Sequence, residues 1–327
     1  MIFCGGIEVK NRIFLAPMAG VTDMSFRKVC ESFGAALTYT EMVSAKALTY
    51  HDGKTAALLR LHSDRRPCFA QIFGHEPDVM AEGAKIALEL SGAEGIDINM
   101  GCPVSKIVGN GEGSALMRDP KKAAAIITAV KKAVNVPVTV KFRKGYESGS
   151  DTCAEFARVM YEAGADAMCI HGRTKAQMYS GTSDINAVAA VKDAVPVPVI
   201  ASGDAFTPEG CENILRQSGA DFIMIARGAQ GNPFIFEDCL RYNAGLEPKR
   251  RTAGDIMDVM LRHAGLSCQE KGERKAMVEF RKHGLWYLGR LSGVKPFKLR
   301  MSAIADMGQL ERLCEEIRAE DPPVKEV

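Results

Sequence analysis

Short apolar runs alternate with longer amphipathic segments along the first two thirds of the chain. Each run is four or five residues long and rich in large apolar side chains, which is typical of a buried strand. Eight runs follow this pattern, at residues 13–16, 36–39, 68–72, 95–98, 136–140, 167–170, 198–201 and 222–225. Eight strands that alternate with helices predict the α/β class and a (β/α)8 TIM barrel.

The segments between the runs carry signals for helix starts and ends. Asp23 suits an N-cap, and the pair Asp119-Pro120 suits a first helical turn. Glycines that suit a left-handed C-cap follow four segments, at positions 34, 92, 164 and 219. Helices are therefore predicted over residues 23–33, 76–90, 119–133, 151–163, 184–193 and 207–217.

The last quarter of the chain has helical periodicity and none of the strand-like runs. Its apolar faces predict a compact bundle with helices over residues 253–271, 273–291, 298–307 and 309–319. We therefore expect two domains, a barrel over residues 1–240 and a smaller α-helical bundle over residues 241–327.

Polar and reactive residues follow almost every apolar run. They are Pro17-Met18, Glu41, Gln71, Asn99 with Cys102, Lys141, His171, Ser202-Gly203-Asp204 and Ala226-Arg227. Taken singly, each could be a solvated strand end, a buried imidazole or a loop cap. In a barrel, however, the C-terminal ends of all strands meet at one mouth, so their shared position predicts a single site.

Cys102 lies in a turn directly after the fourth run. Gly101 and Pro103 on either side favour an irregular turn that presents the thiol to a cleft, whereas a cysteine kept for packing usually lies inside a strand or helix. The glycine-rich segment that follows does not match the dinucleotide-binding motif in spacing or in position after a strand. We interpret residues 104–113 as a mobile loop that closes over a substrate.

The loops after the seventh and eighth runs suit a phosphate group. Ser202-Gly203-Asp204 allows close approach of the backbone, and Ala226-Arg227 adds a permanent cation next to another glycine. Barrels commonly bind phosphate with these two loops. The alternative is two ordinary turns with a surface arginine.

Composition excludes several classes of protein. With 327 residues, 46% hydrophobic and 25% charged, the chain is expected to be globular and cytoplasmic, without a membrane span. Its ten cysteines are dispersed and lack metal-ligand spacing, so reduced thiols and no metal site are expected. The net charge is only +2, but residues 241–300 hold 14 Lys and Arg against 6 Asp and Glu. This excess is typical of contact with nucleic-acid phosphates.

Several ordered motifs together resemble the tRNA-dihydrouridine synthase family, in its B-like bacterial type. These flavin enzymes consist of a barrel followed by a small helical domain. The motifs span nearly the whole chain, at residues 16–23, 97–103, 113–116, 171–174 and 281–283, with Trp286-Tyr287 after them.

The resemblance implies a bound FMN, with different strand-end residues contacting its ring and its phosphate. Pro17, Met18 and Ala19 would lie under the flavin ring. Gln71, Lys141 and His171 would surround it. The phosphate would lie near Ser202, Gly203, Asp204, Ala226 and Arg227.

The family reaction also assigns a chemical role to Cys102. NADPH would reduce FMN, a uridine of tRNA would then accept hydride at C6, and Cys102 would protonate C5. The charge that builds on the uracil could be stabilised by Asn99, Lys141 and His171.

Partners follow from the same resemblance and from the charge excess. We expect a monomer that binds tRNA and NADPH, and the candidate RNA-binding residues are Arg281, Lys282, Lys295, Lys298 and Arg300. Trp286 and Tyr287 could stack on bases, but their helical neighbours favour core packing.

The chain departs from the family pattern at three positions. It has Ser202 where relatives often have Asn, Ala226 where they often have Gly, and Gly109 where they often have a basic residue. Lys106 is a candidate to replace that last charge.

Two other functions are compatible with parts of the sequence. One is a flavin barrel dehydrogenase acting on a free pyrimidine, such as dihydroorotate, which the basic C-terminal segment argues against. The other is a tRNA-binding or folding-assistance protein without catalysis, which Cys102 and the strand-end residues argue against.

Overall fold

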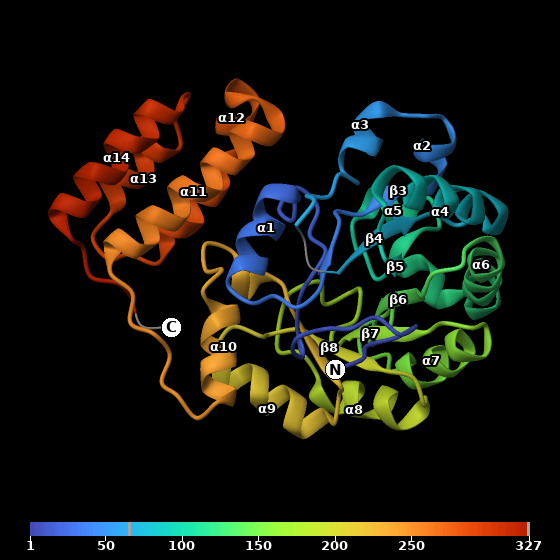
Figure 1. Cartoon of the computed structure of the whole chain (residues 1–327). Coiled ribbons are helices and arrows are strands. Elements are labelled where there is room, and N and C mark those ends of the chain that lie inside the picture. Colours follow the sequence, from blue (N-terminus) through green and yellow to red (C-terminus); the bar gives the residue numbers. More distant parts are fainter. Residues whose placement is uncertain (65–66, 326–327) are drawn as a thin grey trace.

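The strands of the barrel are all parallel and closed into a ring. A computed structural model describes residues 1–64 and 67–325 (Figure 1), so the end of the predicted helical domain at 326–327 lies outside the described residues. The strands are β1 Ile13–Leu15, β2 Thr38–Tyr39, β3 Val43–Ser44, β4 Cys68–Phe73, β5 Gly95–Met100, β6 Val138–Arg143, β7 Ala167–His171, β8 Val199–Ser202 and β9 Phe222–Ile225. Their order in the sheet is β1-β9-β8-β7-β6-β5-β4-β2, and a bridge between Phe14 and Leu37 closes the ring. The predicted TIM barrel is confirmed.

The second strand of the barrel is divided in two, which the sequence pattern did not indicate. Both β2 and β3 pair with β4, through Thr38 opposite Cys68 and Val43 opposite Ile72. The residues between them leave the ladder, and Thr40 Oγ1 there accepts a hydrogen bond from the Gln71 N–H at 3.0 Å. Glu41 also lies in this interruption; it is buried, and its carboxylate accepts a hydrogen bond from the Gly20 N–H in the loop after β1.

The barrel helices confirm the predicted boundaries to within a few residues. They are α1 Met24–Ser32, α4 Pro77–Ser91, α6 Pro120–Ala133, α7 Cys153–Glu162, α8 Ile185–Ala194 and α9 Pro208–Ser218. Asp23 caps α1 by accepting from the Phe26 N–H, and Gly92 and Gly219 are left-handed C-caps. The additional helices are α2 Ala45–Thr49, α3 Gly53–Ala57, α5 Ser105–Gly109 and α10 Ile235–Asn243. The first three are too short to give a periodic signal.

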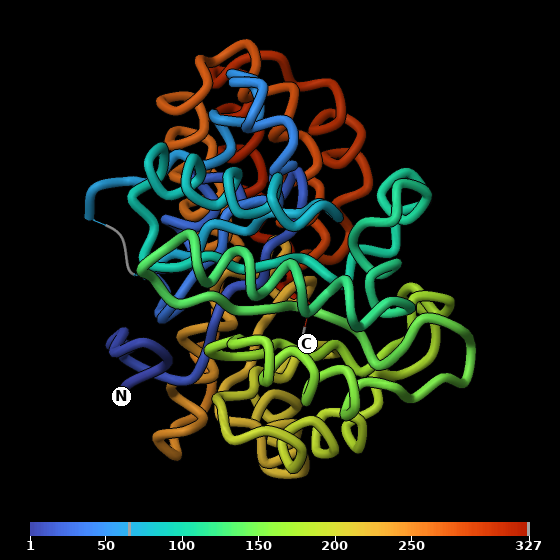
Figure 2. The backbone as a smooth tube through the Cα atoms, turned by 90° about the vertical axis from the view of Figure 1, so that its right-hand side faces the viewer, coloured from blue at the N-terminus to red at the C-terminus, as the bar shows by residue number. Residues whose placement is uncertain are grey.

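The lower half of the barrel is filled by apolar side chains. Phe14 and Phe222 stack with their ring centres 4.8 Å apart, and Phe3 packs edge-on against both. Phe3 belongs to an N-terminal hairpin in which Ile2 bridges Glu8. Figure 2 shows this blue segment at one end of the barrel. That end is sealed, so solvent reaches the interior from the C-terminal ends of the strands.

The C-terminal helices form a bundle beside the barrel (Figure 1). They are α11 Ala253–Lys271, α12 Glu273–Gly289, α13 Lys295–Met301 and α14 Met307–Glu320. The helix predicted over residues 298–307 is wrong in both bounds. Pro296 lies in the first turn of α13, and Asp306 ends the following loop by capping α14 through the Gln309 N–H.

Trp286 and Tyr287 pack inside the molecule, as their neighbours predict. Tyr287 is fully buried, and its hydroxyl lies 3.3 Å from His263 Nδ1. Trp286 is partly buried against the core of the barrel, and its backbone lies directly on Gly231. The Tyr287 ring is therefore not available to stack on a base, and the Trp286 ring contributes part of its surface to core packing.

The contact between barrel and bundle contains buried titratable groups. His263 and His283 lie with their ring centres 4.7 Å apart, and Phe26 of α1 packs against both rings. Beside them, Lys271 pairs with Asp23 and, at 2.9 Å, with Glu279. Burial is the main cause that lowers the pKa of His263, to about 4, and the neighbouring Asp23 only partly opposes it. Burial likewise places the pKa of His283 well below its ordinary value.

Acid is therefore expected to weaken this fold before most carboxylates titrate. In the unfolded chain His263 takes up a proton below about pH 6.5, whereas in the folded protein it stays neutral down to about pH 4. The free energy of unfolding is thus lost as the pH falls through this window, by about 2 kcal/mol at pH 5 from His263 alone. Urea unfolding at pH 7.5, 6 and 5 measures the slope, and His263→Phe should reduce it while the exposed-site control His51→Gln should not. Equal stability at pH 7.5 and 5 would contradict the prediction.

Candidate active site

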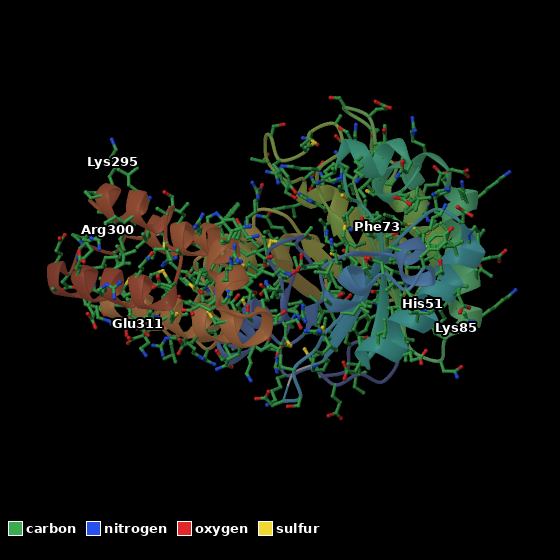
Figure 3. All side chains as sticks on the ribbon, turned by 90° about the horizontal axis from the view of Figure 1, so that it is seen from above. His51, Phe73, Lys85, Lys295, Arg300 and Glu311 are labelled. Carbon is green, nitrogen blue, oxygen red and sulfur yellow. The ribbon has the colours of Figure 1, made fainter. Side chains whose placement is uncertain are left out.

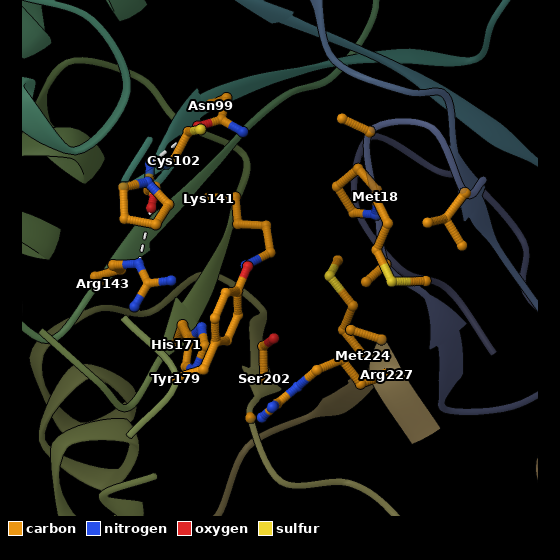
Figure 4. Close-up of a pocket in the computed structure, with 18 of the residues that line it drawn as sticks. Met18, Asn99, Cys102, Lys141, Arg143, His171, Tyr179, Ser202, Met224 and Arg227 are labelled. Carbon is orange, nitrogen blue, oxygen red and sulfur yellow. Dashed lines mark hydrogen bonds between the residues drawn. The ribbon is translucent and has the colours of Figure 1, made fainter. Parts of the chain in front are cut away.

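A pocket of about 480 Å³ opens at the C-terminal ends of the barrel strands (Figure 4). This volume is in the range of sites for small ligands and cofactors. The structure brings together there all the strand-end residues that the sequence singled out for catalysis or cofactor binding. They are Pro17, Met18, Ala19, Gln71, Asn99, Cys102, Lys141, His171, Ser202, Gly203, Asp204, Ala226 and Arg227. We call this cavity the mouth pocket.

Cys102 lies in the turn after β5, held by a side chain of that strand. Asn99 Oδ1 accepts hydrogen bonds from the N–H groups of Gly101, at 3.1 Å, and Cys102, at 2.9 Å. Burial raises the pKa of the Cys102 thiol, against the opposing effects of the Val104 N–H, Arg143 and Lys141. The thiol is therefore protonated at neutral pH and can act as an acid.

Arg143 is a pocket residue that the sequence analysis missed. It is buried, its Nε donates to the Gly101 carbonyl at 2.8 Å, and its Nη1 donates to the carbonyl of Met178 at 2.9 Å. It thus ties the turn of Cys102 to the loop after β7 (Figure 4). The sequence could have predicted this position for Arg143. Residues two apart on a strand share a face, and Lys141, two residues earlier, was already expected to face the pocket.

Two aromatic side chains at the pocket edge were also missed. Tyr179 and Phe206 both line the pocket, and the Arg227 guanidinium lies 4.9 Å from the centre of the first ring and 5.3 Å from the second. Both belong to loops whose course depends on tertiary contacts, so no periodic pattern marks them.

His171 is buried among cations and is neutral. Burial is the main cause that places its pKa well below the ordinary range, and Lys141, Arg143, Arg173 and Arg227 act in the same direction. Lys141 extends from the neighbouring strand β6 into the same pocket. The site therefore combines a charged ammonium with a neutral imidazole, which can donate or accept a hydrogen bond.

Opposite these groups, the segment after β1 forms the other wall of the pocket. Figure 4 shows Met18 facing Cys102, Lys141 and His171 across an open space. The segment is held from below: the Met18 N–H donates to Thr22 Oγ1 at 2.8 Å, and the Gly20 N–H donates to the buried Glu41 carboxylate. Two facing walls of this kind leave a slot that suits a planar ring.

Free backbone donors gather at one end of the slot. Gly203 and Asp204 have left-handed backbones, with φ of 120° and 52°. Within the described chain, the N–H groups of Gly203, Asp204 and Gly228 have no hydrogen-bond partner. With the Arg227 side chain, they form what we call the phosphate cradle, a set of donors that fits a phosphate monoester.

The Asp204 carboxylate joins several parts of the cradle, and its Oδ1 lies 3.5 Å from the Arg227 guanidinium. It accepts from Arg173 Nη2 and from the Ser183 N–H, each at 2.7 Å. Arg173 is buried and also donates to the Gly181 carbonyl at 2.6 Å. The Asp204 side chain therefore links the loops around the cradle, while its backbone N–H stays a candidate donor to a ligand.

The segment predicted as a mobile loop is ordered against Cys102 in this structure. It contains the short helix α5, and the Ser114 N–H after it donates to the Cys102 carbonyl at 3.1 Å. Gly113 has a φ of 57°, and a methyl group there would lie 2.9 Å from that same carbonyl oxygen. Closure of residues 104–113 over a substrate stays a prediction.

The candidate RNA-binding cations lie outside the mouth pocket and differ in availability. Arg281 Nε donates to the Ile304 carbonyl at 2.8 Å, and Arg300 pairs with Glu316. Lys282 reaches the barrel, since a methyl group on Gly20 would lie 3.2 Å from its Nζ. Figure 3 shows Lys295 and Arg300 on the part of the bundle far from the barrel.

Two further cations lie on the barrel itself, Arg118 at the end of the 3-10 helix Gly113–Arg118 after β5 and Lys175 in the loop after β7. Arg118 and Lys175 flank the Tyr146 ring at 4.4 and 5.1 Å from its centre. Among the residues that the structure describes, neither has an ion-pair partner. We call these two residues the rim cations.

The described parts of the chain contain neither a candidate metal site nor a candidate membrane-spanning helix. Residues 1–64 and 67–325 contain no cluster of three or more His, Cys, Asp or Glu side chains placed to hold a metal ion. None of the helices described is both long enough and apolar enough to cross a bilayer.

A closed parallel barrel with a planar slot, a phosphate cradle and a protonated thiol in one pocket defines a class, the barrel oxidoreductases that use a flavin. Solved structures with this fold include histamine dehydrogenase from Rhizobium sp. 4-9, with a TM-score of 0.57 at 14% identity over 84% of this chain. Another is 6-hydroxypseudooxynicotine amine oxidase from Pseudomonas geniculata N1, with a TM-score of 0.59 at 12% identity over 79% of this chain. The chain spans about half the length of either structure, 49% and 52%, so these likenesses show the fold alone.

Sequence comparison identifies the family. The family model for dihydrouridine synthase (Dus) matches residues 14–321. A probable tRNA-dihydrouridine synthase of Rhizobium leguminosarum bv. phaseoli is 43% identical over 88% of each chain. The tRNA-dihydrouridine synthase B of Pseudomonas aeruginosa is 37% identical over 92% of this chain and 91% of its own. The chain therefore belongs to the dihydrouridine synthase family of oxidoreductases, as its motifs predict.

Proposed function

We propose that the protein reduces the C5–C6 double bond of uridine in tRNA, with FMN as its flavin and NADPH as the reductant of that flavin. Family membership supports a flavin oxidoreductase. The observation that carries the proposal is the meeting of a protonated Cys102 thiol and a phosphate cradle in one slot. We extend the proposal to a cytoplasmic enzyme that acts as a monomer.

The residues of the mouth pocket fit the mononucleotide. The cradle of three backbone N–H groups and Arg227 matches one terminal phosphate, and the wall around Met18 matches one face of a ring. Gln71, Lys141 and His171 would contact the ring edge. When bound, the flavin supplies the hydride that adds to C6 of the uracil.

The chain's own groups supply the proton and stabilise charge. Cys102 Sγ would hold the proton for C5, and burial keeps this thiol in its protonated form until it is needed. Negative charge that builds on the uracil oxygens would face the Lys141 ammonium and the neutral His171 ring. Asn99 would orient the turn that carries the thiol.

A uridine inside folded tRNA must leave its stack to reach this pocket, at a cost of about a few kcal/mol. Contacts between tRNA phosphates and surface cations would offset that cost. The candidates are Arg281, Lys282, Lys295, Lys298 and Arg300 on the bundle, together with the rim cations. This requirement distinguishes the proposal from reduction of a free pyrimidine.

The decisive test compares substrates with the purified protein. Protein loaded with FMN and supplied with NADPH should form dihydrouridine in unmodified tRNA and leave free uridine, uracil and orotate unchanged. Mapping of dihydrouridine in cells that lack and then regain the protein identifies the position. Turnover of a free pyrimidine without tRNA activity would support the alternative dehydrogenase, and tRNA binding by a protein that takes up no FMN would support the non-catalytic alternative.

Neutralising the rim cations is expected to weaken tRNA binding. The double variant Arg118→Gln/Lys175→Gln should bind tRNA about tenfold more weakly near 100 mM salt, with a salt dependence shallower by about one to two ions. Filter binding across salt concentrations measures both. Lys85→Gln serves as control, because Lys85 lies on the outer helix α4 and pairs with Glu82. Equal affinity and slope for the double variant and wild type would place the RNA elsewhere.

A further inference from the structure

Asp97 is a buried carboxylate to which the proposed reaction gives no role. It lies on β5, two residues before Asn99, and is 1% exposed. Its two oxygens each accept one short hydrogen bond, Oδ1 from Thr139 Oγ1 and Oδ2 from Gln71 Nε2, both at 2.6 Å. Among the described residues it has no ion-pair partner. Burial is the largest effect and raises the pKa of this carboxylate, whereas Lys141 is close enough to favour the ionised form but does not form an ion pair with Asp97. A carboxylate buried this deeply without a direct ion pair is costly, which indicates a structural or functional role.

A chain of hydrogen bonds leads from Asp97 to the turn of Cys102. Gln71 donates to Asp97 through Nε2, and its Oε1 accepts from Asn99 Nδ2 at 3.0 Å. Asn99 Oδ1 then accepts from the backbone N–H groups of Gly101 and Cys102. Both amide side chains line the mouth pocket, whereas Asp97 lies beneath it.

The Asp97 carboxylate determines which amide groups donate and which accept in this series of hydrogen bonds. An ionised carboxylate can only accept, so Gln71 must turn its NH₂ group toward Asp97 and its oxygen toward Asn99. Asn99 must then offer NH₂ to Gln71, which leaves its oxygen for the turn. If either amide were reversed, Asn99 would aim an NH₂ group at two backbone N–H groups, and the anchor of the turn would be lost.

We propose that Asp97 is a positioning residue for Cys102, which acts by fixing the orientation of the Gln71 and Asn99 amides. Asp97 itself touches neither the pocket nor the thiol. The effect on uridine reduction rests on the proposed function, whereas the effect on the Cys102 turn does not. Two separate readouts therefore decide the two statements.

The first readout is the reactivity of the thiol in the protein as purified. Iodoacetamide labelling of Cys102 is followed by peptide mass spectrometry at pH 8, where Asp97, with a pKa of about 6, is ionised. Asp97→Leu removes both acceptor oxygens while keeping the number and branching of side-chain heavy atoms, and it should change the labelling rate at least fivefold. Asp97→Asn should stay within about threefold of wild type, because Asn can accept from Gln71 while its NH₂ group donates to the Thr139 hydroxyl.

Thr139→Val is the matched control. It removes the other partner of Asp97 from the same buried region but leaves the chain to Cys102 intact, so labelling should stay within about twofold of wild type. If Asp97→Leu does not fold, Gln71→Met interrupts the same chain one residue further and should give the same change. Labelling of Asp97→Leu or Gln71→Met at the control rate overturns the proposal. So does an Asp97→Asn variant as altered as Asp97→Leu, because charge and not hydrogen-bond direction would then be responsible.

The second readout separates the two halves of the reaction. In Asp97→Leu, oxidation of the reduced flavin by tRNA should slow at least tenfold, while its reduction by NADPH should stay within twofold of wild type. A wild-type protein that does not reduce tRNA refutes the proposed function and leaves the labelling result to decide the positioning. Equal slowing of both half-reactions would indicate general damage to the flavin site and would also overturn the proposal.

Discussion

Replacement of Cys102 by Ala is expected to slow the oxidation of reduced flavin by tRNA about 100-fold to 10,000-fold, the range that one positioned proton donor contributes. The thiol is half-buried at the slot, and burial raises its pKa, so wild type offers a proton that Ala cannot offer. Reduction of the flavin by NADPH needs no proton from this residue. Rapid mixing experiments that follow flavin absorbance measure the two steps separately.

The other cysteines provide the control for that experiment. Of the ten, eight are buried, and only Cys268 is half-exposed like Cys102. Cys268 lies on α11 of the bundle, so Cys268→Ala should leave both half-reactions unchanged. Full activity of Cys102→Ala would assign the proton to another donor. Loss of flavin from Cys102→Ala would show that this side chain supports the structure of the flavin site. The reaction step could then not be measured separately in this variant.

The barrel could be predicted because its signal repeats. Each buried strand requires a short apolar run, and each run ends at the same face of the barrel, so position along the chain already defines position in space. Ser202 and Ala226 show how far this reaches: they depart from the usual family residues, yet both line the pocket. Their loops offer backbone groups to the pocket, and the course of the backbone there depends little on which of these small side chains is present.

What could not be predicted depends on contacts between distant segments. The pairing of Asp204 with Arg173 and the anchor from Glu41 to Gly20 each join separate loops. Charge counts also overstate the number of cations that are free to bind RNA, because they ignore ion pairs. Arg300 pairs with Glu316, while Arg118 on the barrel has no such partner within residues 1–64 and 67–325. Composition alone predicts the excess of basic residues in the bundle. Which of these cations are free to bind RNA depends on how the side chains pack and pair.

Replacement of Gly203 by Ala is expected to weaken FMN binding about 100-fold, equivalent to about 3 kcal/mol. The residue has a φ of 120°, and an added methyl carbon would lie 2.3 Å from Ser183 Oγ and 3.1 Å from the His171 ring. The loop must therefore move, and with it the free N–H groups of Gly203 and Asp204 that would hold the phosphate. Fluorescence titration of the apoprotein with FMN, and with riboflavin, measures the loss.

The comparison with riboflavin gives this prediction its specificity. If the cradle binds the phosphate, wild type should prefer FMN strongly and Gly203→Ala should lose most of that preference while riboflavin affinity changes little. Gly219→Ala is the matched control, because its φ of 66° is also left-handed but its added carbon would meet only Lys192, at 3.9 Å. It should lower stability by about 1 kcal/mol and leave FMN bound. An unchanged preference for FMN in Gly203→Ala would place the phosphate outside this cradle, and the slot would then have to be occupied in another orientation.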